Sequence, residues 1–216
     1  MKLNKKIAAI VTTAAIALSA TVGFTLAYFT DYTKTETNTI TMGHVDIDLR
    51  ETSVAGPGVK AGTATDDGYD YNDVMPGDVY SKQPVITVMA GSEDCYVRAL
   101  VTLKTIDTGG DGVISEATLL SYLNINTSDW FIGGLTSNPD GSESAYVYYK
   151  NSLAAGANVT VFSTVSFPSS LTNSSTNDDY IITVKAEAIQ AANVTPTTNP
   201  GGMITGWPAA AIEQYS

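Results

Sequence analysis

The sequence predicts an all-β protein, an antiparallel jelly-roll-like sandwich with one short helix and an extended N-terminal arm. The 216-residue chain is 44% hydrophobic and only 15% charged, so it can bury a core. Its polar residues are largely hydroxyl side chains and it holds 12 tyrosines, a composition that favours strands. Apolar and polar residues alternate with period two in several segments, and Gly- and Asp-rich connectors separate these segments. Short alternating segments joined by such turns are typical of antiparallel sandwiches.

The N-terminal 27 residues are typical of a secretory signal. Three lysines within the first six residues precede an uncharged run, residues 7–24. Small residues at Thr25 and Ala27 predict that a signal peptidase cleaves between Ala27 and Tyr28. We therefore expect a secreted protein. The alternative is a retained membrane anchor, because the run has about the minimum length for spanning a bilayer. The membrane would then be contacted only through the uncleaved signal segment.

Residues 28–43 are predicted to form an extended N-terminal arm. Threonine stands at every second position from 33 to 41, which favours extended chain. The apolar residues change parity at Gly43-His44, where a β-bulge would keep both halves on one face. The arm is therefore a strand without a sheet of its own. Its candidate assembly residues are Tyr28, Phe29, Tyr32, Ile40 and Met42.

Residues 44–194 are predicted to form the jelly-roll body. The expected strands are 85–89, 95–103, 146–149, 159–167 and 180–188. Only Ser115 to Leu123 indicates a helix, with Ser115 as the N-cap. The single cysteine, Cys95, shares its parity with Val97 and is expected to be a buried core residue, an intermolecular disulfide being the alternative.

Residues 195–216 indicate a Pro- and Gly-containing C-terminal tail. Two large apolar residues, Trp207 and Ile212, are candidates for docking this tail on the body.

The composition excludes several classes of function. The net charge is −11, and removal of three lysines with the signal leaves 8 Lys+Arg against 22 Asp+Glu, or −14. Such a chain lacks the basic footprint that nucleic acid requires. His44 is the only histidine, so the sequence has no His-Glu-x-x-His zinc motif. A Ser-His-Asp or Cys-His relay would have to run through His44, whose place in a predicted N-terminal strand argues against it. No glycine-rich phosphate loop is present. We therefore predict no catalytic residues, no cofactor, no metal site and no enzymatic activity.

One loop partly matches a calcium-binding pattern. Asp107 to Glu116 has oxygen-bearing residues at the first and fifth positions and glycine at the sixth. Gly109 and Thr118 stand at the third and twelfth positions, where the pattern needs oxygen ligands and a bidentate carboxylate. The segment is interpreted as an Asp/Gly turn before the helix, with calcium binding as the alternative.

Several short motifs share their order and spacing with a known family. They are Ala27 to Asp31 (Ala-Tyr-Phe-Thr-Asp), Asn38 to Leu49, Val74 to Asp78 (Val-Met-Pro-Gly-Asp), the strand from Cys95 to Leu103, and Lys185 to Ala191. Together they resemble the TasA/camelysin family of bacterial surface proteins, whose signal type is processed by the dedicated peptidase SipW. The resemblance covers most of the mature chain.

This resemblance implies a secreted jelly-roll subunit that polymerises head-to-tail into extracellular fibres of the biofilm matrix. By donor-strand complementation, the arm of one copy would complete the sheet of the next. Other matrix proteins or the cell wall are further candidate partners. Two alternatives stay open: a camelysin-like surface metallopeptidase, and a monomeric cell-surface adhesin whose arm folds back on its own sheet and whose tyrosine-rich face binds glycan.

Overall fold

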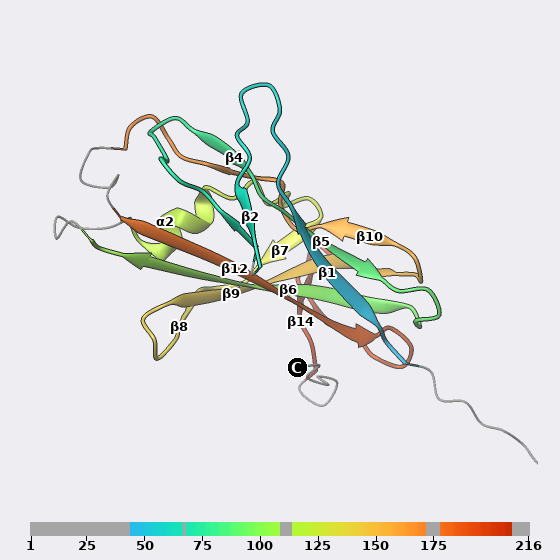
Figure 1. Cartoon of the computed structure of the whole chain (residues 1–216). Helices are drawn as coiled ribbons and strands as arrows, with labels where there is room; N and C mark the ends of the chain where they lie inside the picture. Colours follow the sequence, from blue (N-terminus) through green and yellow to red (C-terminus); the bar gives the residue numbers. More distant parts are fainter. Residues whose placement is uncertain (1–43, 67, 109–113, 172–177, 209–216) are drawn as a thin grey trace, which may run out of the picture. The chain divides into compact units, whose positions relative to one another are not determined.

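The computed structural model describes residues 44–66, 68–108, 114–171 and 178–208 (Figure 1). It confirms the predicted all-β class, because the described residues form antiparallel sheets and one short helix. The jelly-roll strand order stays a prediction. The signal segment, the arm residues 28–43 and Ile212 lie outside the described residues. None of the described residues form a helix with the length and hydropathy needed to cross a membrane.

The first layer of the sandwich is built from short strands. β1 (Ile47–Thr52), β5 (Gln83–Val88) and β10 (Asn158–Thr160) form a sheet in the order β1-β5-β10. β4 (Val79–Ser81) pairs with β11 (Thr164–Ser166) and extends this layer along the chain direction, since only Lys82 separates β4 from β5.

The second layer is built from longer strands. Its order is β12 (Asp179–Gln190), β6 (Cys95–Ile106), β9 (Glu143–Leu153) and β7 (Trp130–Ile132), with β8 (Thr136–Ser137) also paired to β9. β6 and β12 pair without interruption from Cys95↔Gln190 to Ile106↔Asp179. The β6–β9 register shifts once, between Tyr96 and Arg98.

The core lies between the inner faces of the two layers. Cys95, Val97, Ala99, Val101 and Leu103 of β6 are all fully buried, as are Ile86 and Val88 of β5. This confirms the predicted alternation of β6 and the predicted burial of Cys95, which is a free thiol. Burial raises the pKa of this thiol to about 11, so it stays protonated at neutral pH.

The connectors carry the smaller elements. β2 (Thr63–Thr65) and β3 (Gly68–Asp70) form a hairpin between β1 and β4, and β13 (Thr197–Thr198) pairs with β14 (Ile204–Gly206) in the tail. The helix, α2, spans Glu116–Ser121. Its predicted N-cap is confirmed, because the Thr118 N–H donates to Ser115 Oγ at 3.2 Å.

The strand predicted over residues 159–167 is wrong in one respect, because it is divided into β10 and β11. β10 pairs with β5, and β11 pairs with β4. The buried residues Val161 and Phe162 lie in the segment that connects β10 to β11. Two backbone hydrogen bonds hold this step: Val161 N–H donates to Pro84 O, and Lys82 N–H donates to Ser163 O. Pro84 has no N–H to return, so a regular ladder cannot continue here.

Candidate assembly site at an open side of the sandwich

The two long sides of the sandwich differ in whether their edge strands are covered by other parts of the chain. The closed side, as we name it, is formed by β7, β10 and β11. There the indole N–H of Trp130, on β7, donates to Thr160 O of β10 at 3.1 Å and so joins the two layers. Trp130 is itself only 2% exposed.

The segment after α2 covers the rest of the closed side. The Asn124 N–H donates to Thr164 O at 3.2 Å, and Asn124 Oδ1 accepts the N–H groups of Ser163 and Thr164 at 2.7 and 2.8 Å. Leu123 forms a β-bridge with Val165. The backbone groups of this edge therefore already have partners within the chain.

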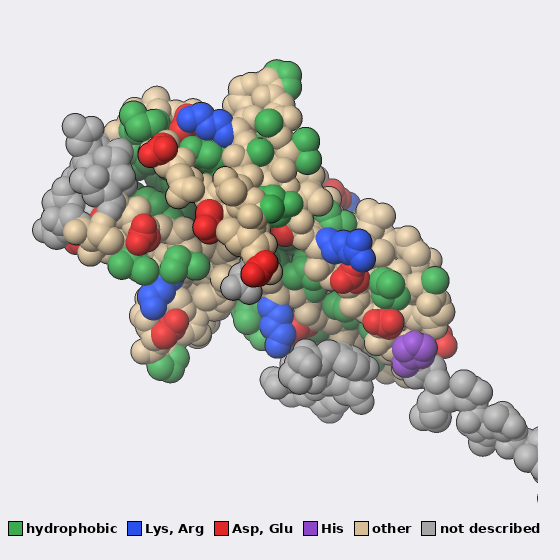
Figure 2. Space-filling view, in the orientation of Figure 1, with side chains coloured by type: hydrophobic (Ala, Val, Ile, Leu, Met, Phe, Trp, Pro, Cys, Tyr) green, Lys and Arg blue, Asp and Glu red, His purple; other side chains and the backbone are tan. Residues whose placement is uncertain are grey.

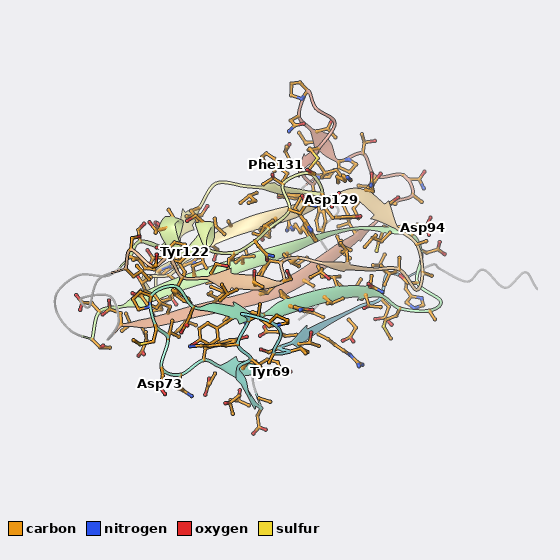
Figure 3. All side chains as sticks on the ribbon, turned by 90° about the horizontal axis from the view of Figure 1, so that it is seen from above. Tyr69, Asp73, Asp94, Tyr122, Asp129 and Phe131 are labelled. Carbon is orange, nitrogen blue, oxygen red and sulfur yellow. The ribbon has the colours of Figure 1, made fainter. Side chains whose placement is uncertain are left out.

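The open side, as we name it, is formed by β1 and β12. Among the described residues, β1 pairs only with β5 and β12 pairs only with β6, so each is the outer strand of its sheet (Figure 1). β1 and β12 contact each other across the layers. In the view of Figure 3, Tyr69 and Asp73, from the connector after β1, lie on the opposite side from Asp129 and Phe131, which flank the closed side.

Apolar side chains on the inner face of the open side remain partly exposed. β6 buries its inner face completely, whereas its neighbour β12 does not. The half-buried residues are Val45, Ile47 and Leu49 at β1, and Tyr180, Ile182, Val184 and Ala186 on β12. In the view of Figure 2, the outer surface of the molecule mixes hydrophobic side chains with scattered charges. The hydrophobic effect therefore favours an additional covering segment here.

A buried ion pair interrupts this apolar face. Lys82 Nζ lies 2.6 Å from Glu51 Oε2, with the two side chains 8% and 21% exposed. The second carboxylate oxygen, Glu51 Oε1, is buried and has no hydrogen-bond partner among the described residues. Leaving a buried charged acceptor unsatisfied costs free energy, so this oxygen can accept a further hydrogen bond from a group outside the described residues.

Hydroxyl groups and aromatic rings follow the ion pair along the layer. Tyr71 Oη and Ser53 Oγ both donate to Ser81 O, at 2.8 and 2.6 Å. Burial raises the pKa of Tyr71 to about 12, so its phenol keeps the proton that it donates. Tyr71 packs edge-on against Tyr80, which packs against Phe167.

The pairing of β1 with β5 fixes the order of these features. Ile47 lies opposite Val88, Leu49 opposite Ile86 and Glu51 opposite Pro84. Lys82 and Tyr80 follow on the same inner face of the first layer. The face therefore reads aliphatic, then charged, then aromatic.

The outer face of the second layer is covered by the tail. The Arg98 guanidinium, 4% exposed, donates to Glu187 Oε2 at 2.7 and 2.5 Å and to Tyr148 Oη at 3.2 Å. It is stacked between Tyr146 and Trp207, whose ring centroids lie 3.8 and 4.3 Å away. The tail thus docks through Trp207, one of the two candidates from the sequence.

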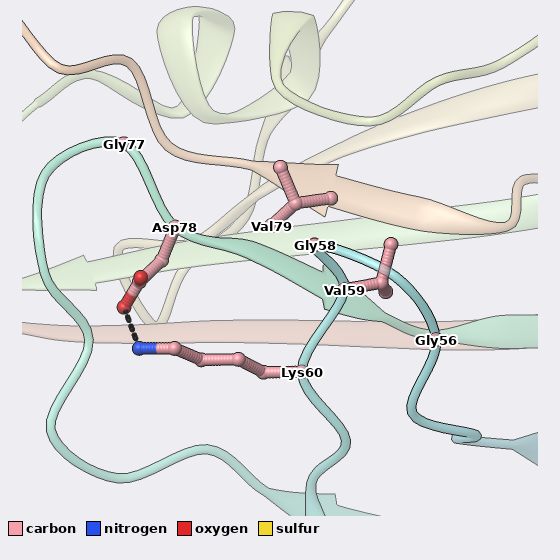
Figure 4. A pocket seen from close by; sticks show the side chains of 7 residues that line it. All are labelled: Gly56, Gly58, Val59, Lys60, Gly77, Asp78 and Val79. Carbon is pink, nitrogen blue, oxygen red and sulfur yellow. Dashed lines mark hydrogen bonds and ion pairs between the residues drawn. The ribbon is translucent and has the colours of Figure 1, made fainter.

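A separate pocket of about 360 Å³ lies beside β4. It is lined by Gly56, Gly58, Val59, Lys60, Gly77, Asp78 and Val79 (Figure 4). Lys60 Nζ and Asp78 Oδ2 pair at 2.6 Å, and this hydrogen bond raises the pKa of Lys60 and lowers that of Asp78. Because the two charges satisfy each other, the pocket gives no indication of a catalytic group.

The remaining candidates from the sequence are only partly described. The cleavage site at Ala27 and Tyr28 and the arm residues lie outside the described residues. His44 is exposed at the surface (Figure 2). Residues 109–113 of the calcium-like loop are also outside, and Glu116 accepts hydrogen bonds from the N–H and hydroxyl of Thr105 at 3.2 and 2.9 Å. Glu116 therefore fastens α2 to β6.

Glu51, Lys82 and Trp130 were missed by the sequence analysis. Glu51 continues the inward parity of Ile47 and Leu49, and that misplaced charge was the available signal.

The fold and the open side define an antiparallel β-sandwich protein with an incompletely covered edge. Residues 2–88 match the family described as camelysin metallo-endopeptidase, a range that includes β1 to β5. Over these residues the chain is similar to that family, which supports the resemblance to the TasA/camelysin family noted in its sequence motifs. No curated protein and no solved structure matched the chain.

The family description implies a metal, which the described residues do not fit. Within the four described ranges, no three His, Cys, Asp or Glu side chains gather in an arrangement that could hold a metal ion. Metal-assisted hydrolysis by an imidazole-ligated zinc would also need more histidine than His44 supplies.

Proposed function

We propose that this protein is a secreted structural subunit that polymerises head-to-tail into extracellular fibres of the biofilm matrix. The arm, residues 28–43, of one copy adds to the open side of the next by donor-strand complementation. The observation that carries the proposal is the contrast between the closed side, joined by Trp130, and the open side, whose inner-face residues are half-exposed. Proteins of the camelysin family are cell-surface or secreted proteins, which supports the location.

An added strand would satisfy two requirements of the open side. It would pair with free backbone groups of an edge strand, and its alternate side chains would cover the half-buried apolar residues. Burying a large apolar side chain contributes about 1.5–3 kcal/mol. Tyr28, Ile40 and Met42, which share one parity, would together contribute on the order of 4.5–9 kcal/mol before ordering costs. This outweighs repulsion between bodies of net charge −14, which salt screens beyond about 8–10 Å.

The symmetry of the contact determines the form of the assembly. A contact between the arm of one copy and the acceptor edge of another joins two different surfaces and is therefore heterologous, so it need not close on itself. Repetition therefore produces a filament.

Deleting residues 28–43 from the mature protein tests the proposal. The body keeps its own core, so the variant should be a folded monomer that forms no fibres, as judged by circular dichroism, light scattering and electron microscopy. Fibres of normal length from the truncated protein would refute donor-strand assembly. An unfolded truncated protein would show instead that the arm completes its own subunit, as the adhesin alternative requires.

The family description makes a metallo-endopeptidase the second candidate. Metal analysis of the purified mature protein, with a casein-cleavage assay, separates the two functions. Stoichiometric zinc and an activity that is lost in His44→Ala would establish the peptidase. We expect neither.

A further inference from the structure

The unpartnered oxygen of Glu51 lies on the face that the arm would cover. Glu51 is on the edge strand β1, its side chain points to the inner face, and Lys82 occupies only one of its two carboxylate oxygens. A donor for Oε1 would have to come from a segment beside β1. Within the described residues no such segment is present.

The arm sequence has a matching pattern on one parity. Tyr28, Thr30 and Tyr32 are followed by Lys34 and Glu36, and then by Asn38, Ile40 and Met42. The inner face of the open side reads aliphatic at Val45 to Leu49, charged at Glu51 and Lys82, and aromatic at Tyr80 and Tyr71. Both patterns are therefore apolar, charged and apolar in turn.

Direction distinguishes the two possible alignments of arm and β1. With Lys34 opposite Glu51, a parallel arm places Tyr32 opposite Leu49 and Tyr28 opposite Val45. An antiparallel arm instead places Glu36 opposite Leu49, which buries a carboxylate against aliphatic side chains. The parallel alignment is therefore favoured.

A parallel arm must come from another copy. Parallel neighbours need a crossover of a dozen or more residues, whereas only residues 44–46 separate the end of the arm from β1. A chain could fold its own arm beside β1 only as an antiparallel hairpin.

We propose that Lys34 of one subunit pairs with Glu51 Oε1 of the next, with the arm parallel to β1 and Glu36 at the level of Lys82. This inference rests on the proposed donor-strand function and specifies its register. Neighbouring strands lie about 4.7–4.9 Å apart, so side chains at the same level on one face are within reach of an ion pair. A one-residue slip would turn Lys34 to the outer face, so the pair selects a single register. Buried charge pairs contribute more to such specificity than to affinity.

Charge exchange between subunits tests the pairing. Lys34→Glu alone sets two carboxylates opposite each other, and Glu51→Lys alone sets two ammonium groups opposite each other. Each variant should assemble with a critical concentration raised about tenfold or more, because like charges at an interface cost several kcal/mol. An equimolar mixture should restore fibres, since every contact between unlike subunits then joins opposite charges.

The mixture also distinguishes pairing between copies from pairing within one chain. If only the double variant Lys34→Glu/Glu51→Lys assembled and the mixture did not, the contact would be within one chain and the proposal would be overturned. Normal fibres from Lys34→Glu alone would overturn it as well. Neither result would affect the arm-deletion test, so the failures of register and of donor-strand assembly can be told apart.

Two controls keep the result interpretable. Thr35→Glu introduces the same carboxylate side chain one residue away on the opposite parity, with half the charge change, and it should leave assembly unchanged. Because Glu51→Lys could unfold the body beside Lys82, Glu51→Gln supplies a neutral isostere. Combined with Lys34→Glu, Glu51→Gln should recover part of the lost assembly, and no recovery in a folded double variant would contradict the pairing.

Discussion

The closed and open sides of this sandwich are made from similar strands but treat their edges in opposite ways. On the closed side, the Trp130 indole N–H donates a hydrogen bond to Thr160 O across the layers. Asn124 Oδ1 accepts hydrogen bonds from the backbone N–H groups of Ser163 and Thr164 at the start of β11. On the open side, β1 and β12 have no second strand partner among the described residues, and a charged oxygen of Glu51 is left without a donor. The same fold therefore closes one edge by contacts within the chain and leaves the other without such contacts among the described residues.

Removing the Trp130 side chain, which joins the two layers on the closed side, should have the largest effect on stability. Trp130→Ala deletes a side chain that is 2% exposed, together with its hydrogen bond to Thr160. We expect a loss of about 3–5 kcal/mol in the free energy of unfolding, measured by urea denaturation. If the loss were below about 1 kcal/mol, typical of a surface position, the closed side would not be sealed in the sense described here.

A matched pair of substitutions compares the core with the open side directly. Val101 on β6 and Val184 on β12 lie opposite each other, but Val101 is fully buried and Val184 is half-buried. Val101→Thr buries a hydroxyl and should cost about 1–3 kcal/mol of stability. Val184→Thr can keep its hydroxyl hydrated in the monomer, so stability should change by less than about 0.5 kcal/mol.

Assembly should reverse that order of sensitivity. Covering β12 with an arm would dehydrate the Val184→Thr hydroxyl, so this variant should have a higher critical concentration than wild type. Equal effects of the two substitutions on both stability and assembly would contradict the difference between the sides.

The smallest effect concerns alkaline pH. Burial raises the pKa of Tyr71 to about 12, above its ordinary value of 10.0. The folded state thus holds this proton more tightly, so the Tyr71 contribution is fully present below pH 10 and is lost as pH rises toward 12. Denaturation at several pH values should show stability falling across this range.

Cys95, whose pKa is raised to about 11, should contribute part of this loss of stability at alkaline pH. The fall should therefore be smaller in Tyr71→Phe and smaller again when Cys95→Ala is added. An unchanged pH dependence in both variants would show that neither group is responsible.

The predictable strands are those whose alternation of apolar and polar residues runs without interruption by a neighbouring strand. β6 alternates Cys95, Val97 and Ala99 inward, and this local pattern needs no knowledge of its partners. The N-cap of α2 was predictable for the same reason, since Ser115 and Thr118 are close in sequence.

The features that could not be predicted depend on distant residues. The division between β10 and β11 is set by Lys82 and Pro84 on the neighbouring strands. Arg98 alternates outward as expected, yet it is 4% exposed because Trp207, more than a hundred residues away, covers it. The role of Glu51 likewise depends on which strand lies beside β1, and no local pattern specifies that.

The unbroken ladder between β6 and β12 has a mechanical consequence for a filament. Each strand is 12 residues long and every residue of one is paired with a residue of the other. A pull directed along these strands loads all of the cross-strand hydrogen bonds together, whereas a pull at right angles would open them one after another. In a fibre of the proposed kind, tension along the strands would therefore load this ladder in shear, and we expect the subunit to resist a larger force in this direction than at right angles to the strands.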